Sequence, residues 1–168
     1  MRLIGAVLLI AAAAGFGMIR ASQLRQRPVV LHAVCDALAV LKNDIVSRGM
    51  TIPDTLAHVS FQCAETIRPF FLTVCLCLKE STDRFSEIWN KGAETLSPYL
   101  NHRELETLQE LGVHLGKYEV NAQAEALDVC IKALENDART AFQDSKQFGR
   151  LYMGLGLTVG TMLAVALY

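Results

Sequence analysis

Apolar residues recur at three- and four-residue steps through most of the chain, which is the spacing of one helix face. In the first such segment they are Leu31, Val34, Cys35, Leu38, Leu41, Ile45 and Val46. Pro28 is suited to the first turn of a helix, and Gly49 to the residue just past its end. The pattern therefore predicts one amphipathic helix between these two residues.

Residues typical of helix starts predict further helices after Gly49. Thr51 can cap a helix, with Pro53 tolerated in its first turn and Asp54 three residues after the cap. Asn101 and Glu104 form a second pair of this kind. The later apolar stripes are Leu56, Val59, Cys63 and Ile67; Phe85, Ile88, Trp89 and Leu96; Leu105, Leu108, Leu111 and Leu115; and Ala124, Leu127, Cys130, Ile131, Leu134, Ala138, Ala141 and Phe142. Short connections predict antiparallel neighbours, and hence an all-α, compact helix bundle.

Two internal features depart from a simple amphipathic pattern. The run from Phe70 to Leu78 is too short to cross a bilayer and is predicted to be a fully buried helix. Gly112 and Gly116 stand four residues apart on one helix face, although each glycine costs about 1 kcal/mol relative to alanine. We expect Gly112 to admit a neighbouring helix backbone, and Gly116 to end the helix in a left-handed conformation.

Both ends of the chain are apolar. No charged residue occurs from Leu3 to Ile19 or from Leu151 to Tyr168. These lengths are at the short end of the roughly 17–25 residues that cross a bilayer. The first run is too long, and too closely followed by arginines, for a typical cleaved signal peptide. The sequence predicts an N-terminal transmembrane anchor (1–24), a helical bundle (28–146) and a C-terminal transmembrane helix (150–168).

The distribution of charge predicts on which side of the membrane the helical bundle lies. All 17 acidic residues lie between Asp36 and Asp144, with only 10 of the 16 basic residues, so this part carries a net charge of 10 − 17 = −7. Arg20, Arg25, Lys146 and Arg150 are among the basic residues that flank it. Because positive charge stays on the cytoplasmic side, the bundle is predicted to be cytoplasmic. Its acidic character argues against a nucleic-acid partner.

The sequence offers little catalytic chemistry. Its five cysteines have no zinc-finger or zinc-ribbon spacing, and its four histidines lie far apart. No metalloprotease, P-loop, nucleophile-elbow or dinucleotide motif is present. We therefore predict no catalytic residue, no metal site and no cofactor. A membrane-bound metal or redox protein using Cys75, Cys77 and a histidine is the less favoured alternative.

Four stretches of the chain carry a family resemblance. They are "MRLIGAVLLI" with its exit "SQLRQRPVVL", then "LAVLKNDIVSRGMTIPDTLAHVS" with its restart at Pro53, "LQELGVHLGKYEVNAQ", and the ending "KQFGRLYMGLGLTVG". Together they resemble the stage III sporulation protein AB family of endospore-forming bacteria. Its most specific pattern is roughly L-G-x-x-L-G, an Asp three residues later and a Gln four after that. The matching residues are Leu111, Gly112, Leu115, Gly116 and Gln123, whereas Glu119 stands where Asp is usual.

The resemblance implies a non-enzymatic part of a larger assembly. The family looks like the inner-membrane platform of type II secretion and type IV pilus machines, within a channel complex between mother cell and forespore. Its helical domain is expected in the mother-cell cytoplasm, at the outer forespore membrane. The implied partners are a secretion-type ATPase, stage III sporulation protein AA, and other membrane proteins of the complex.

Two further expectations concern this role. A platform of a general secretion or pilus machine is the alternative, but such platforms usually carry two copies of the helical module and this chain shows no internal repeat. The carboxylates of Glu104, Glu106 and Glu110 form a candidate face for a basic surface on the ATPase. A solvated helix face without a partner is the simpler interpretation of the same residues.

Overall fold

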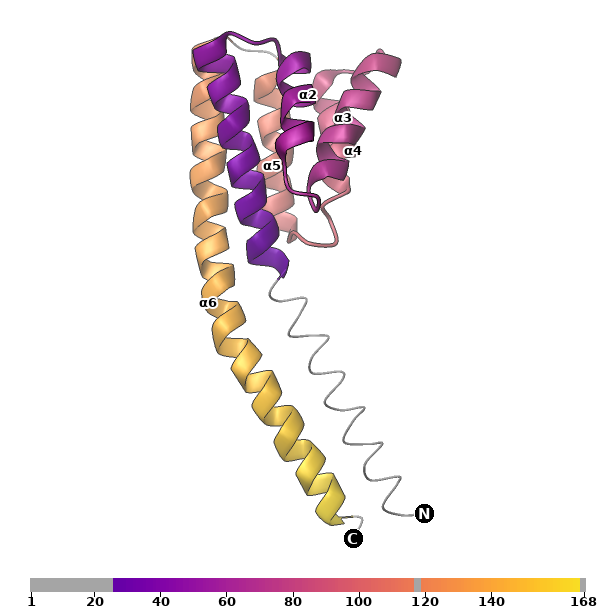
Figure 1. Cartoon of the computed structure of the whole chain (residues 1–168), viewed down its shortest axis with the longest axis vertical. Helices are drawn as coiled ribbons and strands as arrows, with labels where there is room; N and C mark the ends of the chain where they lie inside the picture. Colours follow the sequence, from indigo (N-terminus) through magenta and orange to yellow (C-terminus); the bar gives the residue numbers. More distant parts are fainter. Residues whose placement is uncertain (1–25, 117–118, 167–168) are drawn as a thin grey trace. The chain divides into compact units, whose positions relative to one another are not determined.

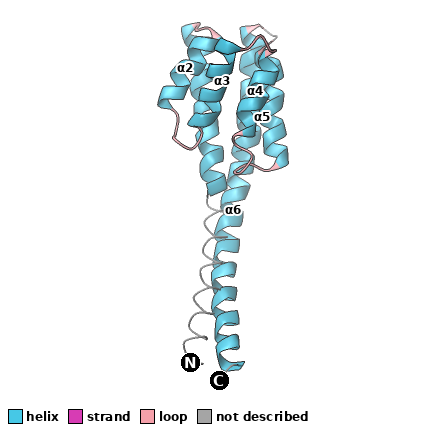
Figure 2. Cartoon of the chain, turned by 90° about the vertical axis from the view of Figure 1, so that its right-hand side faces the viewer, coloured by secondary structure: helices cyan, strands magenta, loops and turns pink. Residues whose placement is uncertain are grey.

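The computed structural model of this chain describes residues 26–116 and 119–166, with side chains as far as Ser145. Its described part is an all-α bundle of six helices, as predicted (Figures 1 and 2). The first helix covers residues 26–48. The others are α2 (Ile52–Gln62), α3 (Arg68–Glu80), α4 (Phe85–Glu94), α5 (His102–Leu115) and α6 (Val120–Ala166).

The helix ends follow the local signals in the sequence. Gly49 ends the first helix with a φ of 62°, a conformation that glycine adopts without steric cost. The Asp54 backbone N–H donates to Thr51 Oγ1 at 3.4 Å, and a proline occupies the first turn of α2. At α5, the Glu104 N–H donates to Asn101 Oδ1, while Glu104 Oε2 accepts from the Asn101 N–H, both at 2.8 Å. The predicted capping pair is therefore a reciprocal capping box.

The chain divides into two compact units. The first is Val29–Ala138, and the second combines Met1–Pro28 with Arg139–Tyr168. Within the first unit, α2 packs on α3, α3 on α4, and α4 on α5. The first helix contacts α6, where Lys42 Nζ lies 2.7 Å from Asp128 Oδ2 and the Cys35 thiol donates to the Ile131 carbonyl at 3.9 Å. The predicted boundaries 28–146 remain a prediction.

The core of this unit consists of the apolar stripes that the periodicity predicts. The largest fully buried side chains are Trp89, Phe70, Phe71, Leu31, Leu38, Leu41, Leu56, Ile67, Ile88, Leu96, Leu108 and Leu115. Burying each such side chain contributes roughly 1.5–3 kcal/mol, which makes the shared apolar faces the main stabilising term. Val46, predicted as part of the first stripe, is instead 47% exposed.

The prediction that α3 is fully buried is wrong. Phe70, Phe71 and Val74 are buried, but Leu72 and Leu76 are 43% and 57% exposed. The physical reason is that α3 has neighbours on only part of its circumference, so an apolar sequence on all sides leaves one apolar side outside. A run of apolar residues cannot reveal by itself how many of its sides are covered.

The predicted membrane segments fall largely outside the described residues. Residues 1–24 are outside them, and 150–168 fall where side chains are not described. Among the residues that the structure does describe, no helix is both long enough and apolar enough to cross a membrane.

Candidate functional site

Trp89 on α4 lies against Gly112, one of the family-pattern residues. It is fully buried, and its indole N–H donates to the Leu108 carbonyl of α5 at 2.7 Å. The Phe70 ring of α3 meets the indole edge-on, with the ring centroids 4.9 Å apart. Edge-to-face pairs of this kind contribute about 0.5–1.5 kcal/mol beyond burial. One side chain of α4 therefore joins α3 to α5.

Gly112 leaves the space that this indole occupies. A methyl group at Gly112 would lie 2.6 Å from Trp89 Cγ and 2.8 Å from Trp89 Cβ, distances that real contacts do not reach. Gly112 does make room for a close neighbour, but the helix backbone predicted there is wrong. The neighbour is the Trp89 side chain, because α4 presents its largest residue at this point.

Gly92, three residues after Trp89 on α4, plays the matching part toward α3. A methyl group there would lie 2.5 Å from Val74 Cγ2 and 2.9 Å from Phe70 Cδ2, both on α3. Sequence reasoning missed this residue. The available signal was a glycine inside the amphipathic segment "SEIWNKGAE", three residues after Trp89.

Gly116 ends α5, but not in the predicted conformation. Its φ is −84° and its ψ −10°, within the right-handed helical region, so the expected left-handed stop is wrong. The Leu115 carbonyl instead accepts a hydrogen bond from Gln123 Nε2 at 3.0 Å. A helix end leaves its last carbonyls without partners. The side chain of Gln123, on the first turns of α6, satisfies one of them, so positive φ is not required.

The three glutamates of the predicted acidic face are not all exposed. Glu104 is fully buried within the capping box of α5 and is therefore not an exposed carboxylate. Glu106 and Glu110 are exposed, and Glu106 Oε1 lies 3.1 Å from His102 Nε2. Glu104 is buried because the side chain three positions after a helix cap folds back onto the cap. Only two of the three glutamates remain as candidates for a partner surface.

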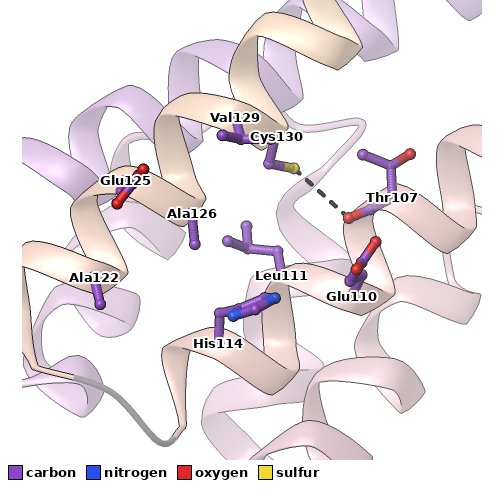
Figure 3. A pocket seen from close by; sticks show the side chains of 9 residues that line it. All are labelled: Thr107, Glu110, Leu111, His114, Ala122, Glu125, Ala126, Val129 and Cys130. Atoms are coloured by element: carbon purple, nitrogen blue, oxygen red, sulfur yellow. Dashed lines mark hydrogen bonds between the residues drawn. The ribbon is translucent and has the colours of Figure 1, made fainter.

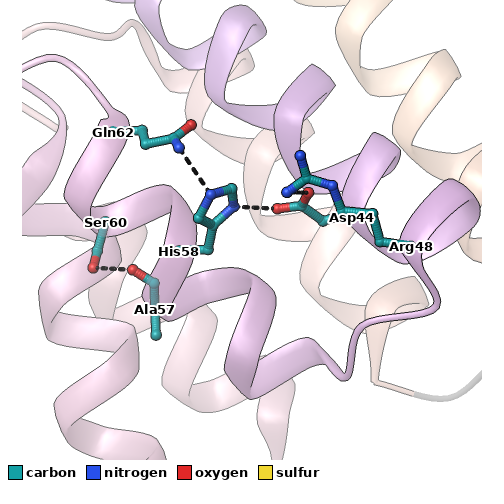
Figure 4. Close-up of polar contacts among 6 residues, drawn as sticks. All are labelled: Asp44, Arg48, Ala57, His58, Ser60 and Gln62. Carbon is teal, nitrogen blue, oxygen red and sulfur yellow. Dashed lines mark hydrogen bonds and ion pairs between the residues drawn. The ribbon is translucent and has the colours of Figure 1, made fainter.

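A polar cluster joins the end of the first helix to α2 (Figure 4). Asp44 is 1% exposed; its Oδ2 lies 2.5 Å from His58 Nδ1, and its Oδ1 lies 3.0 Å from Arg48 Nη1. His58 Nδ1 therefore faces a carboxylate, and His58 Nε2 lies 2.8 Å from Gln62 Nε2. This arrangement positions α2, whose first turn contains Pro53, and it resembles a structural ion pair more than a reactive centre.

Three of the five cysteines, Cys35, Cys63 and Cys130, are buried, and Cys75 and Cys77 are partly exposed. All five are free. Burial raises the pKa of Cys35 and of Cys130 to about 12, so both remain protonated and unreactive near neutral pH. Cys75 and Cys77 are two residues apart on α3, a spacing that directs side chains to different sides of a helix. Among the described residues, no three potential ligands gather to hold a metal ion.

An open groove of about 360 Å³ lies between α5 and the beginning of α6 (Figure 3). Leu111 and His114 are among its α5 residues, and Ala126 and Val129 among its α6 residues. Glu110 and Glu125 line it from the two different helices. The groove therefore combines an apolar interior with carboxylates.

Three comparisons relate this chain to known proteins. A family model described as "Stage III sporulation protein AB" matches residues 2–168. The protein named stage III sporulation protein AB in Bacillus subtilis (strain 168) is 23% identical over 171 residues, covering 99% of both chains. A solved structure of stage III sporulation protein AB has a TM-score of 0.65 and 20% identity, over 71% of this chain and 96% of that one. This last likeness concerns the fold alone.

Replacing Gly112 by alanine is expected to destabilise the protein, because the new methyl displaces Trp89. Overpacking costs about 1–3 kcal/mol and outweighs the roughly 1 kcal/mol that alanine gains in a helix. Trp89 is the only tryptophan in the chain, so a red shift of its fluorescence reports the displacement directly. Gly116→Ala is the control for a milder change, because its methyl would lie 3.1 Å from Phe85 Cβ, a tight contact but no overlap of the kind at Gly112. Equal thermal midpoints and equal spectra for the two variants would contradict the assignment.

Replacing Gln123 by methionine removes the donor to the Leu115 carbonyl while keeping most of the side-chain volume. A buried carbonyl left without its partner costs about 1–3 kcal/mol. We expect a loss of this size in urea unfolding of the full-length chain. Gln143→Met, at an exposed position, is the control and should leave the midpoint nearly unchanged. A Gln123→Met chain as stable as this control would show that the hydrogen bond contributes nothing.

Proposed function

This chain belongs to the stage III sporulation protein AB family, which implies a role in stage III sporulation, and we propose that it acts there as a membrane platform component. In this proposal it is not an enzyme and needs no cofactor. It belongs to a secretion-like channel complex between mother cell and forespore, and it docks a secretion-type ATPase, stage III sporulation protein AA. The observation that carries the proposal is the family match over residues 2–168.

The membrane part of the proposal rests on the charge pattern of the sequence. Uncharged segments of 17 and 18 residues stand at the two ends, and basic residues border the acidic middle at both of them. Two spans with a cytoplasmic bundle satisfy the preference of arginine and lysine for the cytoplasmic side. Both chain termini then lie on the other side of the membrane.

Reporter fusions test this topology. A reporter active only outside the cytoplasm should be active when fused after Tyr168, beyond the second span, and inactive when fused after Ser145, before it. The physical reason is that Lys146 and Arg150 resist transfer across the membrane. Activity at both positions, or only after Ser145, would show that the proposed orientation is wrong.

The docking part of the proposal rests on exposed charge. Glu106 and Glu110 lie one turn apart on α5 and are both exposed, while the surrounding sequence from Asp36 to Asp144 is net acidic. Side chains four residues apart share a helix face, so the two carboxylates form one small anionic surface. A basic surface on the ATPase is the complementary partner. Such contacts raise the association rate and weaken as salt screens them.

Binding of the purified ATPase to the full-length chain should weaken as ionic strength rises, because the screening length falls from about 10 Å at 0.1 M to about 3 Å at 1 M. The double variant Glu106→Lys, Glu110→Lys should lose binding and keep its circular dichroism spectrum. Glu65→Lys with Glu94→Lys makes the same change in net charge at two other exposed positions and serves as the control. The chain alone should hydrolyse no ATP. Equal loss in both double variants would assign the effect to net charge instead of this α5 surface.

A further inference from the structure

The bundle has two uncovered apolar features that are complementary in form: one is concave and one is convex. The concave one is the groove between α5 and α6 (Figure 3). The convex one is a stripe on α3, which we call the α3 stripe, made by Leu72 and Leu76 with Lys79 beyond them. All three residues of the α3 stripe are exposed, and they stand four and three residues apart, the spacing of one helix face.

The groove exists because the side chains of α6 are small where they meet α5. Ala122 and Ala126 are four residues apart on α6 and line the groove on one face. Methyl groups do not fill the space between two helices, so Leu111 forms an apolar floor and Val129 an exposed apolar edge, the latter 64% accessible. At one end the Cys130 thiol donates to the Thr107 carbonyl at 3.8 Å and holds the two helices together.

The lengths of the two features match. The groove spans Thr107 to His114 on α5, which is about 10 Å of helix at 1.5 Å per residue. Leu72 and Leu76 are about 6 Å apart along α3 by the same rise, so both fit within it. An apolar helix stripe laid into an apolar groove is a recurring mode of protein recognition.

The charges match as well. Glu110 and Glu125 are exposed residues that line the groove, and no lysine or arginine is among its described lining residues. Glu110 stands nearer the Thr107 end, and Glu125 nearer the His114 end, so a carboxylate is close to either end. Lys79 extends the α3 stripe by one further turn and supplies the opposite charge. Glu80 follows Lys79 but lies about 100° further round the helix.

We infer that the groove of one copy of this chain receives the α3 stripe of a second copy. Donor and acceptor are different surfaces, so the contact is head-to-tail: each copy that offers its α3 stripe still has an empty groove. Such a contact extends into a ring or an open row of subunits instead of stopping at a symmetric dimer. The groove shares Glu110 with the surface proposed to dock the ATPase, whereas the α3 stripe shares no residue with that surface, so variants of Leu76 separate the two contacts.

A complementation experiment tests this directly. Leu76→Asp places a charge in the α3 stripe, and Val129→Asp places one at the edge of the groove; both positions are exposed, so both variants should fold. Full-length chains with two different affinity tags are mixed in pairs at tens of micromolar, since a contact of about two helical turns is small and expected to be weak. Ala126→Phe, which fills the groove, is a second groove variant.

The wild-type chain should capture itself. Val129→Asp should not capture Val129→Asp, and Leu76→Asp should not capture Leu76→Asp, with recovery reduced at least tenfold in each. The mixed pair should recover capture, because one intact α3 stripe meets one intact groove, and it should stop at a dimer. Val113→Asp makes the same substitution at an exposed valine on α5 and should behave like wild type.

Each of the other outcomes overturns the inference. Equal capture in all pairings would place self-association elsewhere, including in the terminal segments. Capture between two Val129→Asp chains but not between two Leu76→Asp chains would indicate a symmetric contact of α3 with α3. Absence of capture between wild-type chains would show that the groove does not receive a second copy. Binding of the ATPase to the Leu76→Asp chain, measured in parallel, reports separately on the proposed function.

Discussion

The packing of Trp89 of α4 against Gly112 of α5 and Phe70 of α3 is the constraint on which the rest of the bundle depends. Its indole fills the space left by Gly112 and donates a hydrogen bond to the Leu108 carbonyl. These two contacts together determine the distance between α4 and α5 and their register along the helix axis. Gly92 allows Val74 and Phe70 of α3 to approach α4 closely. Gly112 thus makes room for the largest residue of the chain, and Gly92 makes room for Val74 and Phe70. The intrinsic cost of glycine in a helix, about 1 kcal/mol each, is offset by this burial.

This constraint positions the surfaces that bear on function. Once Trp89 fixes α5, the Gln123 side chain reaches the Leu115 carbonyl and brings the first turns of α6 beside α5. Ala122 and Ala126 then face α5 across an unfilled space, and the groove results. Of the family-pattern residues, Leu111 lines the groove, whereas Gly112 and Gln123 make contacts inside the bundle. They hold the α5 and α6 pair in the arrangement that leaves Glu106 and Glu110 exposed and the groove open.

The two proposed interactions use different chemistry on one small bundle. Docking of the ATPase relies on exposed carboxylates, whose effect is long-range and sensitive to salt. The head-to-tail contact relies on apolar surface that the bundle leaves uncovered on α3 and in the groove. Because Leu76 and Glu106 lie on different helices, each contact can be disrupted without the other.

The sequence by itself determined the helix content, the capped starts at Thr51 and Asn101, and most of the core, because helical periodicity and capping are local properties that a few neighbouring residues specify. It also identified Gly112 and Gly116 as unusual. Only the tertiary structure decided what lies against each of them: an indole at Gly112, and at the end of α5 a glutamine from the next helix in place of a left-handed turn. It likewise decided that Glu104 is buried and that α3 keeps an exposed apolar stripe. Burial and partners depend on residues distant in sequence, and no local pattern contains that information.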